Sequence, residues 1–233
     1  MEIFIRLCMI YIIGATLGWF TELIYRRIAH HAWINPGFLV GPDLPLYGFG
    51  VLILYLICTA DYSFIPTPAW RAVFVILLIT FSMTALEYIT GLIFIKGMKV
   101  KLWDYSDRWG NIQGIICPLF TFFWAAGGAL YYLLIHPFVL SAVQWISANH
   151  IYSFFLGLYA GVLLVDICYS FRIVTRIRHW AAENRIEVRY EELKLAIRRR
   201  AEERKERRSF LLPFKSRRGL QNELDKYGND RKQ

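Results

Sequence analysis

Residues 70–95, WRAVFVILLITFSMTALEYITGLIFI, form a long apolar stretch in which only Arg71 and Glu87 carry charge. A bilayer core of about 30 Å is crossed by about 20 mostly apolar residues in one helix, so this stretch predicts a transmembrane helix. Similar stretches occur near 3–25, 46–62, 114–138 and 151–173. The chain is therefore predicted to be all-α, a polytopic membrane helix bundle of five transmembrane helices with a cytoplasmic C-terminal helix.

The composition and the charge distribution indicate that the chain consists of two parts. The chain is 56% hydrophobic and only 19% charged, which excludes an ordinary soluble domain and a disordered protein. Most of the net charge of +9 lies in the last quarter of the sequence. We expect a nearly neutral five-span membrane domain at 1–175 and a basic, partly helical cytoplasmic tail at 176–233.

The positions of Lys and Arg between the spans predict the orientation. Arg26 and Arg27 follow the first span, the connection 96–113 is basic, and the tail follows the fifth span, whereas the alternate connections carry little positive charge. Cytoplasmic loops are enriched in Lys and Arg. We therefore expect an integral cell-membrane protein with its N-terminus outside and its C-terminus in the cytoplasm.

Three carboxylates inside the predicted spans are the strongest functional signal. Glu22, Glu87 and Asp166 each lie within about 6 to 14 Å of a cytoplasmic helix end. Intramembrane acids usually mark a pathway or a site. With two inner connections rich in Gly, Pro, Trp and Tyr, they predict an acidic polar pocket on the cytoplasmic side. The candidate substrate-binding residues are Glu22, Tyr47, Glu87, Trp103, Asp104, Asn111 and Asp166.

Structural alternatives remain open for these residues. Glu22 stands four residues before Arg26 and can simply pair with it, and Asp166 can hydrogen-bond across helices. Small residues four apart, Gly14 with Gly18 and Gly157 with Gly161, favour packing within the chain over a homo-oligomer interface. The four cysteines stand singly in apolar segments and indicate neither disulfides nor a metal site.

The sequence contains no P-loop, no zinc-protease spacing and no nucleophile elbow. Catalytic residues and cofactors therefore stay unassigned. In the tail, Ile186, Tyr190, Leu193 and Ile197 form an apolar seam on a helix predicted at 179–208. The following segment 207–218 mixes cations with apolar residues, which favours binding to anionic inner-leaflet lipid over binding to nucleic acid.

Several short motifs resemble a bacterial membrane family known as putative type-IV ABC transporters, or CmpB-like proteins. The matching elements are Gly18-Trp-Phe-x-Glu22 with Tyr25, Pro45-x-Tyr47-Gly48-x-Gly50, Leu86-Glu87-Tyr88 with Gly91, Trp103-Asp104-Tyr105-Ser106, and Asn111-x-x-Gly114. The resemblance implies an integral membrane protein and the permease part of a transporter.

Three functions follow from these observations. The first is transport of a cation, a cationic solute or a proton-coupled substrate through the acidic pocket, as an oligomer or with a separate ATPase subunit. The second is an enzyme that acts on lipid headgroups at the inner leaflet, with Glu87, Asp104 and Asp166 as the acidic groups. The third is a membrane scaffold that binds partners through the tail. We favour transport.

Overall fold

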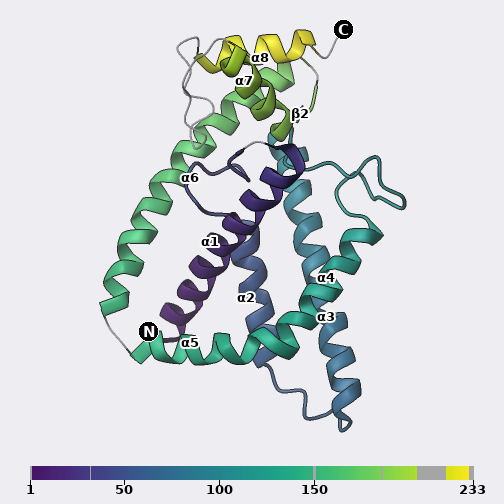
Figure 1. The fold of residues 1–233 in the computed structure, drawn as a ribbon, viewed down its shortest axis with the longest axis vertical. Coiled ribbons are helices and arrows are strands. Elements are labelled where there is room, and N and C mark those ends of the chain that lie inside the picture. The colour runs from purple at the N-terminus through teal and green to yellow at the C-terminus, as the bar shows by residue number, and fades with distance from the viewer. Residues whose placement is uncertain (1, 32, 149–150, 185, 204–218, 231–233) are drawn as a thin grey trace. The chain divides into compact units, whose positions relative to one another are not determined.

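The computed structural model describes residues 2–31, 33–148, 151–184, 186–203 and 219–230, and these residues are mostly helical (Figure 1). In chain order the elements are α1 (Glu2–His30), α2 (Pro45–Thr59), α3 (Pro68–Leu92), the π-helix η1 (Ile93–Gly97), β1 (Val100–Lys101), α4 (Pro118–Leu130), the π-helix η2 (Tyr131–Ile135), α5 (His136–Ala148), α6 (Ile151–Glu183), β2 (Val188–Arg189), α7 (Tyr190–Glu203) and α8 (Gly219–Asp230).

Four helical stretches of the described residues are long and apolar enough to cross a membrane. They are Ile3–Ala29, Pro68–Gly97, Pro118–Trp145 and Phe154–Glu183. The second predicted span forms α2, which is apolar but has only 15 residues. At 1.5 Å per residue α2 is about 22 Å long, shorter than a typical bilayer core. The structure thus establishes a helical membrane-type chain with four candidate spans.

The chain divides into two compact units, and each is made from separate parts of the sequence. Unit 1 comprises 1–18, 44–90 and 105–162, and unit 2 comprises 19–43, 91–104 and 163–233. The described part of the predicted tail therefore packs in one unit with two of the connections between the apolar helices.

Close packing at glycines joins the helices of unit 1. A Cβ added at Gly18 of α1 would lie 2.4 Å from the Tyr47 ring of α2, and one added at Gly128 would lie 2.5 Å from Ile79 of α3. Gly18 thus packs within the chain, as predicted. Gly157 and Gly161 of α6 behave differently, because a Cβ at either position would meet no described atom within 4 Å.

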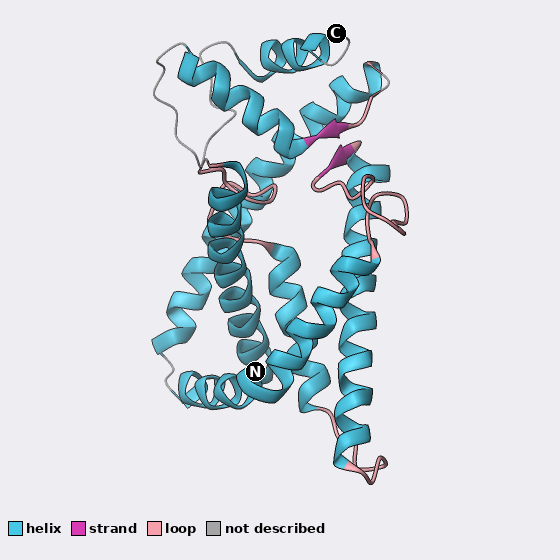
Figure 2. Cartoon of the chain, turned by 45° about the vertical axis from the view of Figure 1, so that its right-hand side comes forward, coloured by secondary structure: helices cyan, strands magenta, loops and turns pink. Residues whose placement is uncertain are grey.

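Unit 2 has an apolar core of its own beside a small parallel sheet. In Figure 2 the strands β1 and β2 lie side by side, with Val100 opposite Val188. The buried core residues come from β1, α6, β2, α7 and α8: Val100, Val174, Ile177, Trp180, Ala181, Val188, Tyr190, Leu193, Ile197, Leu224 and Tyr227. The apolar seam predicted in the tail is confirmed, since three of its residues are in this core and Ile186 packs against it.

The prediction of one continuous helix at 179–208 is wrong, because the structure has two helices there with the strand β2 between them. Helix α6 ends at Glu183, and the Asn184 and Ile186 amides close its last turn by donating to Trp180 O and Ala181 O. The chain then runs extended so that the Val188 amide donates to Lys99 O at 3.0 Å, and α7 begins at Tyr190. Apolar periodicity alone does not reveal this break, because the seam continues through it and the strand partner is distant in sequence.

Candidate functional site

Among the described side chains of unit 1, the most enclosed carboxylate is Glu87, on α3. Its side chain is 4% exposed, and each of its oxygens accepts one hydrogen bond. The Tyr105 hydroxyl donates to Oε1 at 3.0 Å, and the Trp124 indole donates to Oε2 at 2.8 Å. Tyr105 lies in the loop before α4 and Trp124 lies on α4. We call Glu87, Tyr105 and Trp124 the Glu87 centre.

Aromatic neighbours hold Tyr105 in place. Its ring stacks on Phe120 with centroids 4.2 Å apart and an interplanar angle of 11°. Burial, the Glu87 carboxylate and the nearby Tyr47 hydroxyl all raise the pKa of Tyr105 above its usual value. The phenol therefore keeps its proton and acts as the donor to Glu87.

The two hydrogen bonds explain how a carboxylate is tolerated at this position. A carboxylate in a membrane span costs about 2.5 to 3.5 kcal/mol on insertion scales. A hydrogen bond to a charged group contributes about 1.5 to 3 kcal/mol, so two of them offset that cost without a counter-cation. The Glu87 centre is thus hydrogen-bonded, and none of the cations that the structure describes pairs with it.

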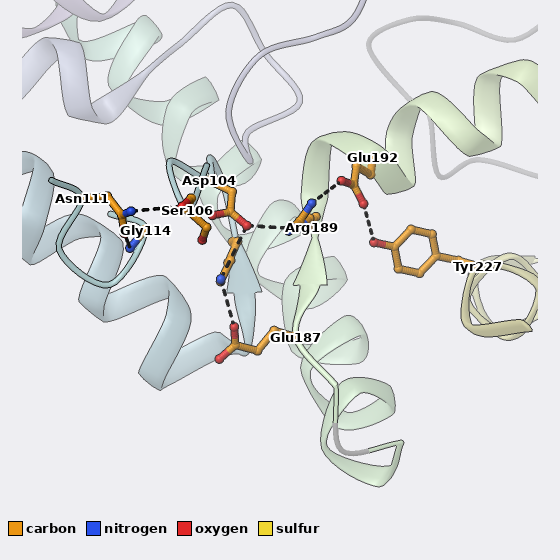
Figure 3. Close-up of polar contacts among 9 residues, drawn as sticks. Asp104, Ser106, Asn111, Gly114, Glu187, Arg189, Glu192 and Tyr227 are labelled. Carbon is orange, nitrogen blue, oxygen red and sulfur yellow. Dashed lines mark hydrogen bonds and ion pairs between the residues drawn. The ribbon is translucent and has the colours of Figure 1, made fainter. Parts of the chain in front are cut away.

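Asn111 organises the loop between β1 and α4. Its Nδ2 donates to Ser106 O at 3.0 Å and its Oδ1 accepts from the Gly114 amide at 3.0 Å (Figure 3). Its Nδ2 also donates to Arg108 O at 2.8 Å. Gly110 and Gly114 both have positive φ, which glycine adopts without strain. The described contacts make Asn111 a residue that shapes the loop carrying Tyr105.

In unit 2, Asp166 of α6 binds the backbone of the connection after α1. Its oxygens accept from the Val40 amide at 3.0 Å and the Gly41 amide at 2.7 Å, and Ser170 Oγ donates at 2.9 Å. The same connection ends at Asp43, whose side chain is buried. Burial and the nearby Asp166 charge raise the pKa of Asp43 to about 7.

Other buried groups hold the 33–43 connection from two further helices. Asn35 accepts from the Trp19 indole of α1 at 2.6 Å and donates to Leu39 O and Val40 O. From α7, Lys194 Nζ donates to Asn35 O at 2.8 Å and to Gly37 O at 2.6 Å. Burial lowers the pKa of Lys194. The connection is therefore fixed by α1, α6 and α7 together.

Glu22 takes part in a chain of ion pairs. Arg26 Nε lies 3.1 Å from Glu22 Oε1, as the alternative reading of the sequence expected, and Arg26 Nη1 lies 2.5 Å from Glu191 Oε1 on α7. Arg26 is itself buried. This charge chain ties the end of α1 to α7.

Asp104 belongs to a second charge chain, which Figure 3 shows. Its Oδ2 lies 3.0 Å from Arg189 Nε and 3.5 Å from Lys101 Nζ. Arg189 continues to Glu192 at 2.9 Å, and the Tyr227 hydroxyl donates to the same carboxylate at 3.4 Å. The acid predicted to face substrate thus joins β1 to β2 and α7.

The structure distributes the seven candidate residues over both units. Unit 1 holds Tyr47, Glu87 and Asn111, with Tyr47 close to the Tyr105 of the Glu87 centre. Unit 2 holds the other four, Glu22, Trp103, Asp104 and Asp166, of which Trp103 is half-buried.

Sequence reasoning missed three residues with key contacts: Trp124, Asn35 and Lys194. Trp124 lies in an aromatic run typical of any lipid-facing span, and Lys194 is one of many cations in a basic segment. Asn35 begins an Asn-Pro-Gly turn, and this turn was the signal that could have identified it.

The described residues form a helical chain with four candidate spans and a second compact unit that contains most of the Lys and Arg residues, which defines a polytopic α-helical membrane protein. The family model described as Putative ABC-transporter type IV matches residues 9–171, and the chain belongs to this family. The match covers parts of both units and ends within α6. The resemblance recognised in the sequence motifs is confirmed.

A search of the curated proteins found no match, and a search of the solved structures found none either.

Proposed function

We propose that the chain is the permease-like membrane component of an ABC-type transporter and that its substrate meets the Glu87 centre. The observation that carries this proposal is the buried carboxylate of Glu87, which has two neutral donors and no cation among the described residues. Glu87 and Tyr47 of unit 1 are the residues that we assign to the predicted acidic site. The three candidate acids of unit 2, Glu22, Asp104 and Asp166, are engaged by cations or backbone amides of their own unit.

Five membrane crossings agree best with the set of chain segments that make up unit 2. This unit contains the carboxyl ends of α1, α3 and α6, so these three ends lie on one side of the membrane. Because α3 is a candidate span that ends in unit 2, it must start on the opposite side at Pro68. The chain leaves unit 2 at Asp43, and α2 is the helix available to cross before Pro68. We therefore propose that α2 crosses despite its length, by local thinning of the bilayer.

The charge distribution favours a cytoplasmic unit 2. All of the 27 Lys and Arg residues except Arg6, Arg71 and Arg108 belong to it. Positive charge in short connections marks the cytoplasmic side. With five crossings the N-terminus is then outside and the C-terminal helix is cytoplasmic.

A fusion experiment tests this topology directly. A reporter that is active only in the cytoplasm is inserted after Asp61 or after Pro36, or is joined to the C-terminus. We expect activity from the second and third positions and none from the first. Equal activity from the first two insertions would show that α2 does not cross.

Energy for transport must come from elsewhere, because the sequence has no P-loop. We propose a separate ATPase subunit that docks on the connections 27–45 and 96–113. The full-length chain, purified in mild detergent from its own cells, should bring down a P-loop ATPase in a fixed ratio and with ATP hydrolysis. Purification without any such subunit would contradict the ABC-type proposal.

The role of Glu87 is tested in cells that lack the chain. The variant Glu87→Gln keeps the shape of the side chain and removes its charge, so it should fail to restore the function lost in the deletion strain. Asp61→Asn is the matched control, because Asp61 is exposed and its hydrogen bonds among the described residues go to Ser63 of its own turn. Full rescue by Glu87→Gln would refute the assignment.

An enzyme acting on lipid headgroups is the alternative, and the structure lends it less support. Asp104, on which that hypothesis depends most, is paired with Arg189 and Lys101. Among the described residues, three or more His, Cys, Asp or Glu do not gather anywhere in a way that could hold a metal ion. The lipid-binding segment predicted at 207–218 lies outside the described residues, and its role stays a prediction.

A further inference from the structure

The Glu87 centre holds a buried carboxyl group that no cation of the described chain pairs with. Each carboxylate oxygen accepts from a neutral donor, and among the described residues no Lys, Arg or His pairs with it. The Trp124 indole nitrogen is a donor only, so Oε2 must act as an acceptor. Burial disfavours the charged form of the Glu87 carboxyl group and the two donated hydrogen bonds favour it, so a cation bound beside it would stabilise the charged form. An anion enclosed in this way attracts a positively charged ligand.

The surroundings of the carboxylate suit an organic cation better than a metal ion. Ca²⁺ and Mg²⁺ need six or more oxygen ligands, whereas the described side chains here offer two carboxylate oxygens, one phenol oxygen and the Thr84 hydroxyl. The remaining neighbours are aromatic: the Trp124 indole, the Tyr105 ring and, stacked on it, Phe120. Ammonium groups bind favourably to aromatic rings, best to Trp, and to carboxylates.

Thr84 adds a hydrogen-bond acceptor next to Glu87. It lies three residues before Glu87 on α3 and hence on the same face of the helix. Its Oγ1 is buried and has no hydrogen-bond partner among the described residues. A hydroxyl of this kind can accept from an N–H group, which a primary or secondary ammonium has and a quaternary ammonium lacks.

We infer that the Glu87 centre binds the primary or secondary ammonium group of an organic solute. The Glu87 carboxylate supplies the opposite charge, Trp124 and Tyr105 supply the aromatic contacts, and Thr84 accepts an N–H. This inference rests on the proposed function, because it names the substrate class of the same centre.

The test measures binding of simple probe cations to the full-length protein in lipid nanodiscs at fixed pH and ionic strength. The probes are n-butylammonium, tetramethylammonium and Na⁺, and the readout is the change in tryptophan fluorescence that is lost in Trp124→Phe. We expect saturable binding of n-butylammonium and weaker binding of the other two. Glu87→Gln should weaken n-butylammonium binding at least ~10-fold, since it removes one partner of an enclosed charge pair.

Two further variants keep the test informative if Glu87→Gln does not fold. Thr84→Val has nearly the shape of the wild-type side chain and should weaken n-butylammonium binding while leaving the weak tetramethylammonium binding unchanged. Asp61→Asn should leave both unchanged.

The outcomes separate the inference from the proposed function. If the centre responds only to Na⁺ or to pH, or prefers tetramethylammonium, the ammonium inference is wrong, while a failed rescue by Glu87→Gln in cells still supports transport. If no probe binds and Glu87→Gln rescues the deletion strain fully, both proposals fall.

Discussion

Removing the Asp166 carboxylate should release the 33–43 connection. Asp166→Ala deletes the acceptor of the Val40 and Gly41 amides and leaves Ser170 Oγ without its partner. Each hydrogen bond to a charged group contributes about 1.5 to 3 kcal/mol. Because Lys194 still holds the start of the connection, we expect a local loss of about 2 to 4 kcal/mol, not the full sum.

Hydrogen exchange of the purified full-length chain measures this loss at the two amides. A loss of 2 to 4 kcal/mol corresponds to exchange that is ~30- to ~1,000-fold faster at Val40 and Gly41. Asp61→Ala is the matched control, because Asp61 binds the Ser63 amide at 2.8 Å in the same carboxylate-to-backbone manner. It should change exchange only at Ser63.

Unchanged protection of Val40 and Gly41 in Asp166→Ala would refute this account of Asp166. The connection would then be held by α1 and α7 alone, and Asp166 would be available for a substrate, as the sequence first suggested. Faster exchange throughout the chain of Asp166→Ala would instead indicate global unfolding. Exchange at the Ser63 amide of the same variant is the internal reference, because it should then also become faster.

Three further results are expected. Burial raises the pKa of Asp43 to about 7 in the folded chain, from 3.8 for a free Asp side chain, so its contribution to stability is full at low pH and is lost as the pH rises through about 7. Thermal melting of the full-length chain between pH 5 and pH 8 should show this loss, and Asp43→Asn should reduce it. Gly18→Leu should lower the melting temperature, because its side chain would collide with Tyr47. Gly161→Leu should leave the melting temperature unchanged, and a change in oligomeric state on size-exclusion chromatography would identify Gly161 as a contact between copies.

The apolar helices were predictable because the bilayer imposes a length and a composition on them. Residues 70–95, the stretch with the clearest pattern, lie within α3 and η1. The length of an apolar stretch does not predict whether α2 crosses the membrane. This helix has only 15 residues, and its crossing depends on where its two ends are held. That information lies in the packing of residues 19–43 with 91–104, which are distant in the sequence.

The same small-residue motif packs against a neighbouring helix in one place and not in another, so the motif alone does not predict helix packing. Gly14 and Gly18 pack against α2, whereas Gly157 and Gly161 meet nothing within 4 Å among the described residues. Both pairs have the same spacing, so the difference arises from the neighbouring helix and not from the motif. The apolar seam of the tail was predictable from the sequence, because all of its residues face one core and their spacing reflects this directly.

Depth in the membrane placed Glu22, Glu87 and Asp166 in one group, but their partners separate them. Glu22 shares Arg26 with Glu191, and Asp166 binds two backbone amides, so the negative charges of both are used to hold unit 2 together. Such acids resist substitution for structural reasons, and loss of function in their variants would not identify a binding site. Glu87 has two hydrogen bonds and no opposite charge beside it in the part of the chain that the structure describes. The stability of the fold does not require a carboxyl group in such a position. A buried carboxyl group without a cation partner among the described residues is the stronger indication of a ligand site, and for that reason the proposed function depends on Glu87.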